Sequence, residues 1–210
     1  MEVHALLFVP RRTPPESKET KNNIKLYKNR VFVNHSASLL PEWLNFVKGV
    51  VDSDDVPSDM SRQALLHTLR TTKQALVHKC LEMFAEIAEK QDEYAKFYQQ
   101  FGKCLKHGVH DDPAHWTTLA ELMRYHSSTS GEELISFKTY VDRLKPGQQD
   151  IFYITGDSIA AVSTSPIHMA LREEGFEVLY LVDEVDEYAV QQWKEFDGKK
   201  FRALHTADRW

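Results

Sequence analysis

Short apolar runs alternate with polar turns over the first fifty residues, a pattern typical of β-strands. The run from Val3 to Val9 predicts a buried strand. Ile24–Tyr27 and Arg30–Val33 predict a strand or a hairpin, with Lys28-Asn29 near the bend. Pro41 then opens a predicted helix, because apolar residues follow it at helical spacing. These residues are Trp43, Leu44, Val47 and Val50.

The middle of the chain has the period of amphipathic helices. The acidic segment Asp52–Pro57 ends the first predicted helix, and apolar residues then recur at steps of three and four. Asp112-Pro113 predicts a further helix start, with a cap followed by a first-turn proline. The apolar stripes are Leu65, Leu66, Leu69, Leu76, Cys80, Phe84 and Ile87; Tyr94, Phe97, Phe101 and Leu105; and Trp116, Leu119, Ala120 and Met123. Each helix has one apolar face, so the helices are predicted to pack on one another.

The last third of the chain predicts strands that alternate with helices. The expected strands are Ile151–Ile154, Phe176–Val182 and Phe201–Leu204. One helix lies before Gly175, a suitable C-terminal cap residue, and the other spans about Asp186 to Phe196. This order favours a small sheet with parallel connections. The pattern as a whole predicts α/β structure, then helices, then α/β structure.

Composition narrows the function classes. The chain has 210 residues, of which 42% are hydrophobic and 27% charged, the balance of a soluble globular protein. A formal net charge of -5 argues against general attraction to nucleic acid, and no apolar run approaches the roughly 20 residues of a membrane span. The N-terminus has no signal-peptide pattern. Cys80 and Cys104 are expected to be free thiols, buried or half-buried.

Several segments, together covering nearly the whole chain, resemble the heat-shock protein 90 family of chaperones. The most specific is Pro41–Pro57, seventeen residues in nearly family order. Other matching segments are Asn22–Tyr27, Arg30–Val33, Gly108–Asp112, Leu122–Tyr125, Tyr153–Ser158, Phe176–Tyr180, Asp186–Tyr188 and Glu195–Lys199. The amino-acid sequence around Leu44–Asp55 and Phe196–Phe201 is most similar to that of the endoplasmin branch. This similarity implies that the protein resides in the endoplasmic reticulum, with the cytoplasm as the alternative compartment. The glycosylation sequon Asn34-His35-Ser36 is compatible with the former.

The resemblance implies the middle domain of an ATP-dependent chaperone involved in protein folding and the stress response. Its implied fold is an α/β/α sandwich section, then a three-helix coil, then a smaller α/β/α section. On this chain, residues 1–56 would be the remainder of the larger α/β subdomain, 57–127 the helical connector and 128–210 the smaller α/β subdomain. The implied partners are client proteins, co-chaperones, and the chaperone's own N-terminal ATP domain and C-terminal dimerisation domain.

The same resemblance assigns a catalytic and ATP-binding role to Arg62. The family's middle domain lends an arginine to the γ-phosphate of ATP, which the N-terminal domain binds with Mg, and the matching segment here is Met60-Ser61-Arg62. A guanidinium is a rigid, permanently charged donor that suits the charge developed in phosphoryl transfer. Ser61 is a plausible helix N-cap, which would place Arg62 in the first turn. The isolated segment would be no enzyme, but part of an ATPase in the full-length protein.

The sequence departs from the family pattern close to this arginine. The family usually has glutamines soon after it, one of which also contacts the phosphate, and here that position is Leu66. The upstream loop Pro14–Lys18 lacks the exposed apolar residues that the family tends to place there. We therefore predict weaker or differently regulated ATP turnover.

Two other functions compete with this interpretation. One is a non-catalytic protein-binding scaffold of the same fold. Leu66 supports this alternative, because it occupies the position of the family's phosphate-contacting glutamine. The other is an unrelated α/β enzyme with a site at the ends of the Ile151 and Phe176 strands, where such sheets often bind ligands.

No metal site is predicted. The histidines at 107, 110 and 115 do not have the spacing of a closed zinc site, and the aspartates at 52, 54 and 55 lack the glycine and glutamate of a calcium loop.

Overall fold

The structure is a computed structural model that describes residues 3–12, 24–35, 39–53 and 62–204, with the side chains of 34–35 and 62–69 left undescribed. The chain divides into two compact units, Met1–Phe101 and Gly102–Trp210. The sequence-predicted loop at Pro14–Lys18 lies outside the described residues. The three-part division at residues 56 and 127 stays a prediction.

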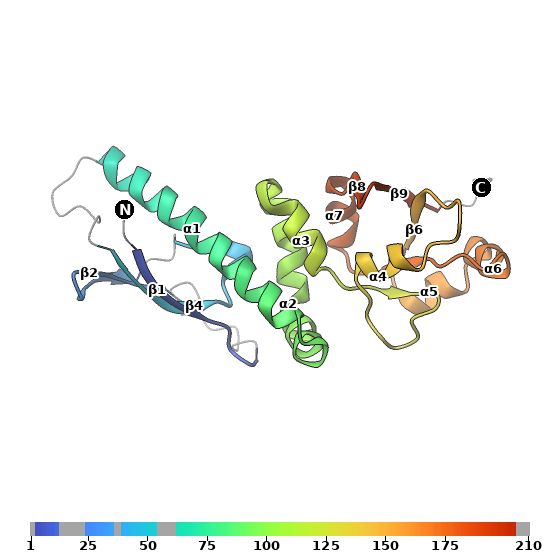
Figure 1. Cartoon of the computed structure of the whole chain (residues 1–210), viewed down its shortest axis with the longest axis horizontal. Coiled ribbons are helices and arrows are strands. Elements are labelled where there is room, and N and C mark those ends of the chain that lie inside the picture. Colours follow the sequence, from blue (N-terminus) through green and yellow to red (C-terminus); the bar gives the residue numbers. More distant parts are fainter. Residues whose placement is uncertain (1–2, 13–23, 36–38, 54–61, 205–210) are drawn as a thin grey trace. The chain divides into compact units, whose positions relative to one another are not determined.

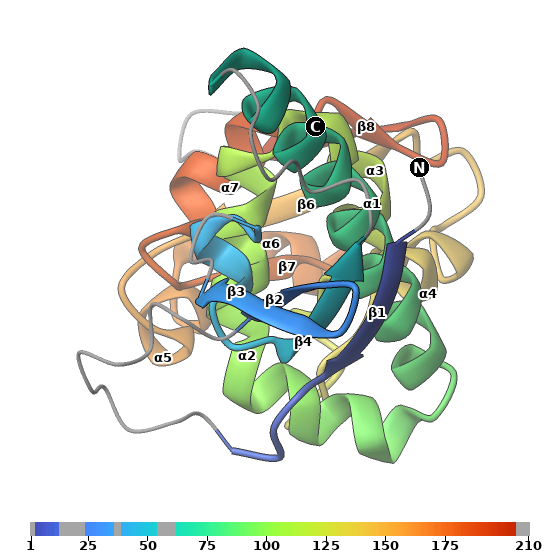
Figure 2. The same cartoon turned by 90° about the vertical axis from the view of Figure 1, so that its left-hand side faces the viewer.

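The first unit contains a four-stranded mixed sheet. Its strand order is β1 (Val3–Phe8), β4 (Lys48–Ser53), β2 (Ile24–Lys28) and β3 (Val31–His35). β4 runs antiparallel to β1 and parallel to β2, and β2 pairs antiparallel with β3. Helix α1 (Arg62–Ala88) lies over one face of this sheet (Figure 1, Figure 2). The predicted first strand and hairpin are confirmed.

The hairpin turn is made by two residues with left-handed backbone conformations. Asn29 and Arg30 have φ angles of 49° and 65°. Positive φ at both central residues suits the right-handed twist of the two strands, and asparagine tolerates it better than arginine does. The Arg30 backbone N–H donates a hydrogen bond to Asp52 Oδ2 at 3.1 Å, which ties the turn to the neighbouring strand β4.

The predicted helix after Pro41 is wrong. Only a short 3₁₀ turn, η2 (Glu42–Leu44), forms there, and the chain continues into β4. In β4 burial alternates, so that Gly49 and Val51 are buried while Val50 between them is exposed. The apolar positions after Pro41 fit both periods locally, and pairing with a strand on each side of β4 decides for the extended form.

Two long helices follow and confirm the predicted helical middle. α1 buries Leu76, Cys80 and Phe84, and α2 (Gln91–Asp111) buries the stripe predicted for it. Cys80 and Cys104 are free, the first buried and the second half-buried, as predicted, and burial raises the pKa of Cys80 to about 12.

The next helix begins differently from the prediction. The chain enters it through a 3₁₀ turn, η3 (Pro113–His115), before α3 (Trp116–Leu122). The Asp112 side chain makes no capping hydrogen bond, because its Oδ2 lies 3.0 Å from Nδ1 of His115 instead.

The second unit contains a five-stranded sheet with a parallel centre. Its order is β5 (His126–Ser127), β7 (Leu179–Leu181), β6 (Asp150–Thr155), β9 (Lys199–Ala203) and β8 (Glu195–Phe196). β6 runs parallel to both β7 and β9, whereas the two short edge strands are antiparallel. The predicted parallel connections are confirmed.

Apolar side chains cover both faces of this second sheet. On one face, Phe152 and Ile154 pack with residues of α5 (Ile159–Ser163) and α6 (Pro166–Glu173). On the other face, Phe137 at the start of α4 (Phe137–Asp142) packs edge-on against Trp193 and Phe201, with ring centroids 4.9 and 5.0 Å away. The mixed α/β class predicted from the sequence is therefore confirmed.

The C-terminal ends of two helices in this unit can be compared with the ends predicted from the sequence. α6 ends as predicted: Gly175 has a φ of 74°, and its N–H and that of Phe176 bond back to the carbonyls of Arg172 and Leu171. Helix α7 (Asp186–Gln192) is shorter than predicted, because Glu195–Phe196 turns into strand β8. The turn through Asp197 and Gly198, both with positive φ, makes the hairpin with β9.

Candidate functional site

The predicted catalytic residue, Arg62, is the first residue of α1. This agrees with the expected position in a first helical turn, where unpaired backbone N–H groups and the helix dipole favour an anion. Its side chain, that of Leu66, and the motif residues Met60 and Ser61 lie outside what the structure describes. Its role in the site therefore stays a prediction.

The far end of α1 is anchored by an aromatic cluster within the first unit. The Phe46 ring, which follows the η2 turn, stacks on Phe101 with centroids 4.3 Å apart and on Phe84 at 5.7 Å. Phe97 completes the cluster, 5.1 Å from Phe84. At 1.5 Å rise per residue, the first turn of α1 lies about 33 Å along the helix from Phe84. The cluster thus fixes the direction of the helix that begins with Arg62.

The face of the first sheet turned away from α1 carries exposed apolar side chains. Leu6 and Phe8 of β1 are 66% and 51% exposed, and Val50, paired with Leu6, is 38% exposed. Phe32 of β3 is 46% exposed and packs edge-on against Tyr27. The first strand was predicted to be buried; it is a strand, but the described residues cover only one of its faces. We call Leu6, Phe8, Phe32 and Val50 the outer sheet face.

Two lysines lie on this outer sheet face, because Lys48 pairs with Phe8 and Lys25 pairs with Val50. The described residues between positions 3 and 53 include six Lys or Arg and two Asp or Glu, although the chain as a whole carries a net charge of -5. The basic residues are Arg11, Arg12, Lys25, Lys28, Arg30 and Lys48, and the acidic ones are Glu42 and Asp52. This part of the first unit is therefore both apolar and positively charged.

A buried ion network in the second unit was not predicted from the sequence. Lys106 of α2 is 4% exposed, and its Nζ lies 2.7 Å from Asp183 Oδ2 and 2.8 Å from Asp186 Oδ1. Asp186, at the start of α7, also accepts hydrogen bonds from the Tyr125 hydroxyl and from the Asp183 backbone N–H. Burial raises the pKa of Asp186, while Lys106 acts in the opposite direction. The signal available in the sequence was a lysine inside an otherwise apolar helix stripe.

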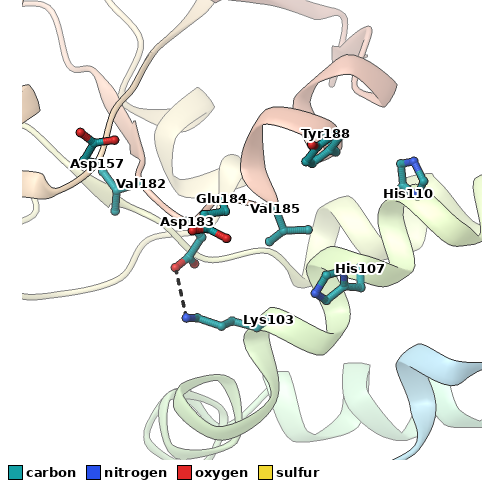
Figure 3. Close-up of a pocket in the computed structure, with 9 residues that line it drawn as sticks. All are labelled: Lys103, His107, His110, Asp157, Val182, Asp183, Glu184, Val185 and Tyr188. Atoms are coloured by element: carbon teal, nitrogen blue, oxygen red, sulfur yellow. Dashed lines mark ion pairs between the residues drawn. The ribbon is translucent and has the colours of Figure 1, made fainter.

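A cavity of about 640 Å³ lies at the carboxyl ends of β6 and β7 (Figure 3). The unrelated-enzyme alternative placed a site at the ends of these two strands. The nine side chains that line the cavity include no serine, threonine or cysteine.

Two of the three histidines discounted as zinc ligands, His110 and His115, pair with neighbouring aspartates. His110 Nδ1 lies 2.9 Å from Asp111 Oδ1, and His115 pairs with Asp112. Within the described ranges, no group of three or more His, Cys, Asp or Glu residues could hold a metal ion. No helix in the same ranges is both long and apolar enough for a membrane span.

Comparison with known proteins identifies the family. The model of the Hsp90 protein family matches residues 1–208. The chain is 45% identical to Heat shock protein 83 of Leishmania donovani over 210 residues, covering 97% of this chain and 46% of that protein. It is 38% identical to an endoplasmin homologue of Hordeum vulgare over 231 residues, covering 96% of this chain and 29% of that protein. The chain thus spans less than half the length of these relatives.

A solved structure shows which part of the family the chain represents. The middle domain of a putative heat shock protein from Plasmodium falciparum superimposes with a TM-score of 0.83 at 28% identity, covering 96% of this chain and 82% of that one. The endoplasmin homologue is less similar than Heat shock protein 83, so the predicted preference for the endoplasmin branch is supported only in part. The extended match to the family model and the agreement of the fold lead to one conclusion: the chain belongs to the Hsp90 family and is the middle domain of such a chaperone.

Proposed function

We propose that, in the full-length chaperone, this middle domain donates Arg62 to the γ-phosphate of ATP held by the N-terminal domain. The observation that carries the proposal is that Arg62 opens α1 immediately after the Met60-Ser61 motif. A helix start offers partial positive charge, and a guanidinium adds a full one with a planar donor fork. Arginines supplied to phosphoryl-transfer sites accelerate the reaction by roughly 10³ to 10⁵.

The nucleotide and its Mg are proposed to be bound mainly by the N-terminal domain. When bound, Mg would neutralise charge on the phosphates. The contribution of this chain is a single cation, positioned by the first turn of α1. Because Leu66 cannot donate a hydrogen bond, the glutamine contact of the family is missing, and we expect slower turnover than in a member with that glutamine.

Mutation of the full-length protein tests the catalytic role. Arg62→Ala should reduce steady-state ATP hydrolysis by at least about 10³-fold if the arginine acts as in other phosphoryl-transfer sites. Arg70→Ala is the matched control, since Arg70 is an exposed arginine two turns further along α1, and it should retain the parental rate. Leu66→Gln should raise the rate. Hydrolysis by Arg62→Ala at the parental rate would refute the assignment.

A non-catalytic scaffold is the second candidate function, and the exposed outer sheet face favours it. Four large apolar side chains on one sheet face form the kind of patch that binds other proteins. Trp43 and Trp193 are 4% and 3% exposed and belong to the core. Client proteins and co-chaperones are therefore proposed to contact the sheet rather than these tryptophans.

Mixing this chain with the matching N-terminal ATP domain separates the two functions. Stimulated hydrolysis would support arginine donation, and binding without stimulation would support the scaffold.

The compartment is a separate proposal. The endoplasmic reticulum is supported by the endoplasmin homologues among the relatives, and the cytoplasm remains the alternative. A mass shift at Asn34 that is removed by an endoglycosidase, measured on protein from its native source, would support the former.

A further inference from the structure

A histidine is buried in the apolar cluster between α6 and the second sheet. His168 of α6 is 2% exposed, and the centroid of its ring lies 5.5 Å from that of Tyr180 in β7. A histidine is less often fully buried than the aliphatic residues around it, and this one has no part in the ATP site proposed above. The other buried members of the cluster are Phe152, Ile154, Val162, Ile167, Leu171, Val178 and Leu204.

One ring nitrogen of His168 has a hydrogen-bond partner, and the other has none among the described residues. Nε2 lies 2.7 Å from the Tyr180 hydroxyl, whereas Nδ1 is buried without a partner. A neutral imidazole has one N–H donor, but the protonated ring has two. The Tyr180 hydroxyl can accept from Nε2, and the Nδ1–H of the charged ring is then buried without an acceptor. Protonation in the packed state therefore costs both desolvation of the charge and an unmade hydrogen bond.

The polar groups around His168 do not compensate for this cost. From β7, Tyr180 contributes a neutral hydroxyl, because burial raises its pKa. From α5, the Ser163 carbonyl favours the charged ring but completes no hydrogen bond with Nδ1. α6 itself contributes Arg172, a like charge one turn further on, and no carboxylate in the described part of the chain pairs with His168. Burial has the largest effect, and the pKa of His168 is lowered from the ordinary 6.5. β6, the segment before β7 and the end of β9 contribute apolar side chains to the cluster: Phe152, Ile154, Phe176, Val178 and Leu204.

The two helices that cover this site depend on packing for their stability. α5 has five residues and α6 has eight, and Ser165 at the start of α6 makes no side-chain capping hydrogen bond. Helices this short are unstable alone in water, so apolar contacts with the sheet hold α6 in place. Strand β6, by contrast, is paired on both sides, with β7 and β9. A charge placed under α6 is therefore expected to open the α5–α6 segment before it disrupts the sheet.

We propose that His168 is an acid-sensitive switch, whose protonation releases α5 and α6 from the second sheet and exposes the apolar cluster beneath them. The released ring is hydrated and takes up a proton more readily than the packed ring, so opening is favoured progressively as the pH falls below 6.5. If the packed ring stays neutral, the equilibrium constant for opening rises by up to about thirtyfold between pH 7.5 and pH 5.0. The switch does not depend on Arg62 or on ATP.

Hydrogen exchange of the chain at pH 7.5 and pH 5.0, corrected for the intrinsic effect of pH on amide exchange, tests the proposal. The opening constants of the amides of α6 should rise by about ten- to thirtyfold in acid. Those of β6 should rise by less than about threefold, since the sheet stays closed. In addition, the ring C–H signals of His168 in the NMR spectrum should titrate with a midpoint below 6.5.

Variants assign the proton to this histidine. His168→Leu combined with Tyr180→Phe removes both members of the hydrogen bond and leaves apolar side chains, so the acid-induced rise in α6 should disappear. His168→Gln, which cannot titrate in this range, should also abolish the rise and serves if the double variant does not fold. His107→Gln is the matched control, because His107 is an exposed histidine of the same unit, and it should keep the parental rise.

Four outcomes would overturn the proposal. Unchanged opening constants in α6 of the parent would exclude an acid-induced opening. An equal rise in β6 would mean that the whole unit unfolds rather than the α5–α6 segment. A rise that persists in the histidine variants would assign the proton to another group. A titration midpoint of His168 at or above 6.5 would remove the driving force.

Discussion

Two lysines of α2, three positions apart, show how burial determines how much an ion pair contributes to the stability of the fold. Lys106 has a side chain 5% exposed and bonds to two aspartates, whereas the Lys103 side chain is 79% exposed and reaches only Asp183 at 3.8 Å. A buried charge that loses its partner has no water to replace it, while a surface ion pair contributes little.

Replacing these lysines should therefore have very different effects on stability. Lys106→Met leaves Asp186 buried without its cation and should lower the free energy of unfolding by about 3–5 kcal/mol. Lys103→Met, the matched control, should lower it by no more than about 1 kcal/mol. Urea unfolding of the two variants and the parent measures both values. Equal losses would contradict the importance of burial.

The buried His168 gives the chain a pH-dependent contribution to stability. Its Nε2 lies 2.7 Å from the Tyr180 hydroxyl in the apolar cluster on the α5–α6 face of the second sheet, and burial lowers its pKa from the ordinary 6.5. The unfolded chain then binds a proton more readily than the folded one. The contribution of His168 is complete above pH 6.5 and is lost as the pH falls below that value.

His168→Gln keeps a hydrogen-bonding side chain but cannot titrate in this range. The loss of unfolding free energy between pH 7.5 and pH 5.5 should be smaller in this variant than in the parent. Denaturant unfolding at the two pH values provides the comparison. An unchanged pH dependence would exclude His168 as the titrating group.

At the scale of elements, the segment Pro41–Ser53 links the sheet of the first unit to its helices. Phe46 lies between the η2 turn and β4, and its ring packs against Phe84 of α1 and both Phe97 and Phe101 of α2. One side chain thus joins a strand connection to two helices.

Phe46→Ala should be strongly destabilising because it leaves a cavity among three rings. The expected loss is about 3–5 kcal/mol of unfolding free energy. Phe8→Ala removes an equally large ring from an exposed position and should have a much smaller effect, since little apolar surface returns to water. Thermal and urea unfolding of both variants would test this, and similar losses would argue against the aromatic anchor.

At the scale of the whole molecule, charge and apolar surface are unevenly distributed. The described residues between 3 and 53 are rich in Lys and Arg, two of which lie on the exposed outer sheet face, although the chain is acidic as a whole. A surface of this kind favours client segments that combine apolar and acidic residues.

If clients bind the outer sheet face as the scaffold proposal holds, the double change Leu6→Ser and Phe8→Ser should abolish most of any suppression of aggregation of a heat-denatured model client, measured by light scattering. Met169→Ser is the matched control, because Met169 of α6 is 54% exposed but lies in the other unit. If the control is as damaging as the double change, client binding is not localised to this face.

Local periodicity predicted secondary structure correctly wherever spacing and turn residues were enough to determine the element. The helical stripes of α1 and α2, the hairpin of β2 and β3, and the cap at Gly175 all followed from spacing and turn residues. It failed after Pro41, where apolar residues fit two periods and strand pairing chose between them. It also failed after Gln192, where the Asp197-Gly198 turn drew the chain into a hairpin.

The sequence by itself determined the family, the order of α/β and helical sections, and the position of Arg62 at a helix start, because these depend on residue order and local spacing. Only the tertiary structure decided which faces are covered, which charges meet and where a cavity forms. Lys106 and Asp186 are 80 positions apart, and Leu6 and Val50 are 44 apart, so no local pattern relates them. The burial of a group depends on the neighbours that the fold brings together, and the strength of its electrostatic interactions depends on the same neighbours.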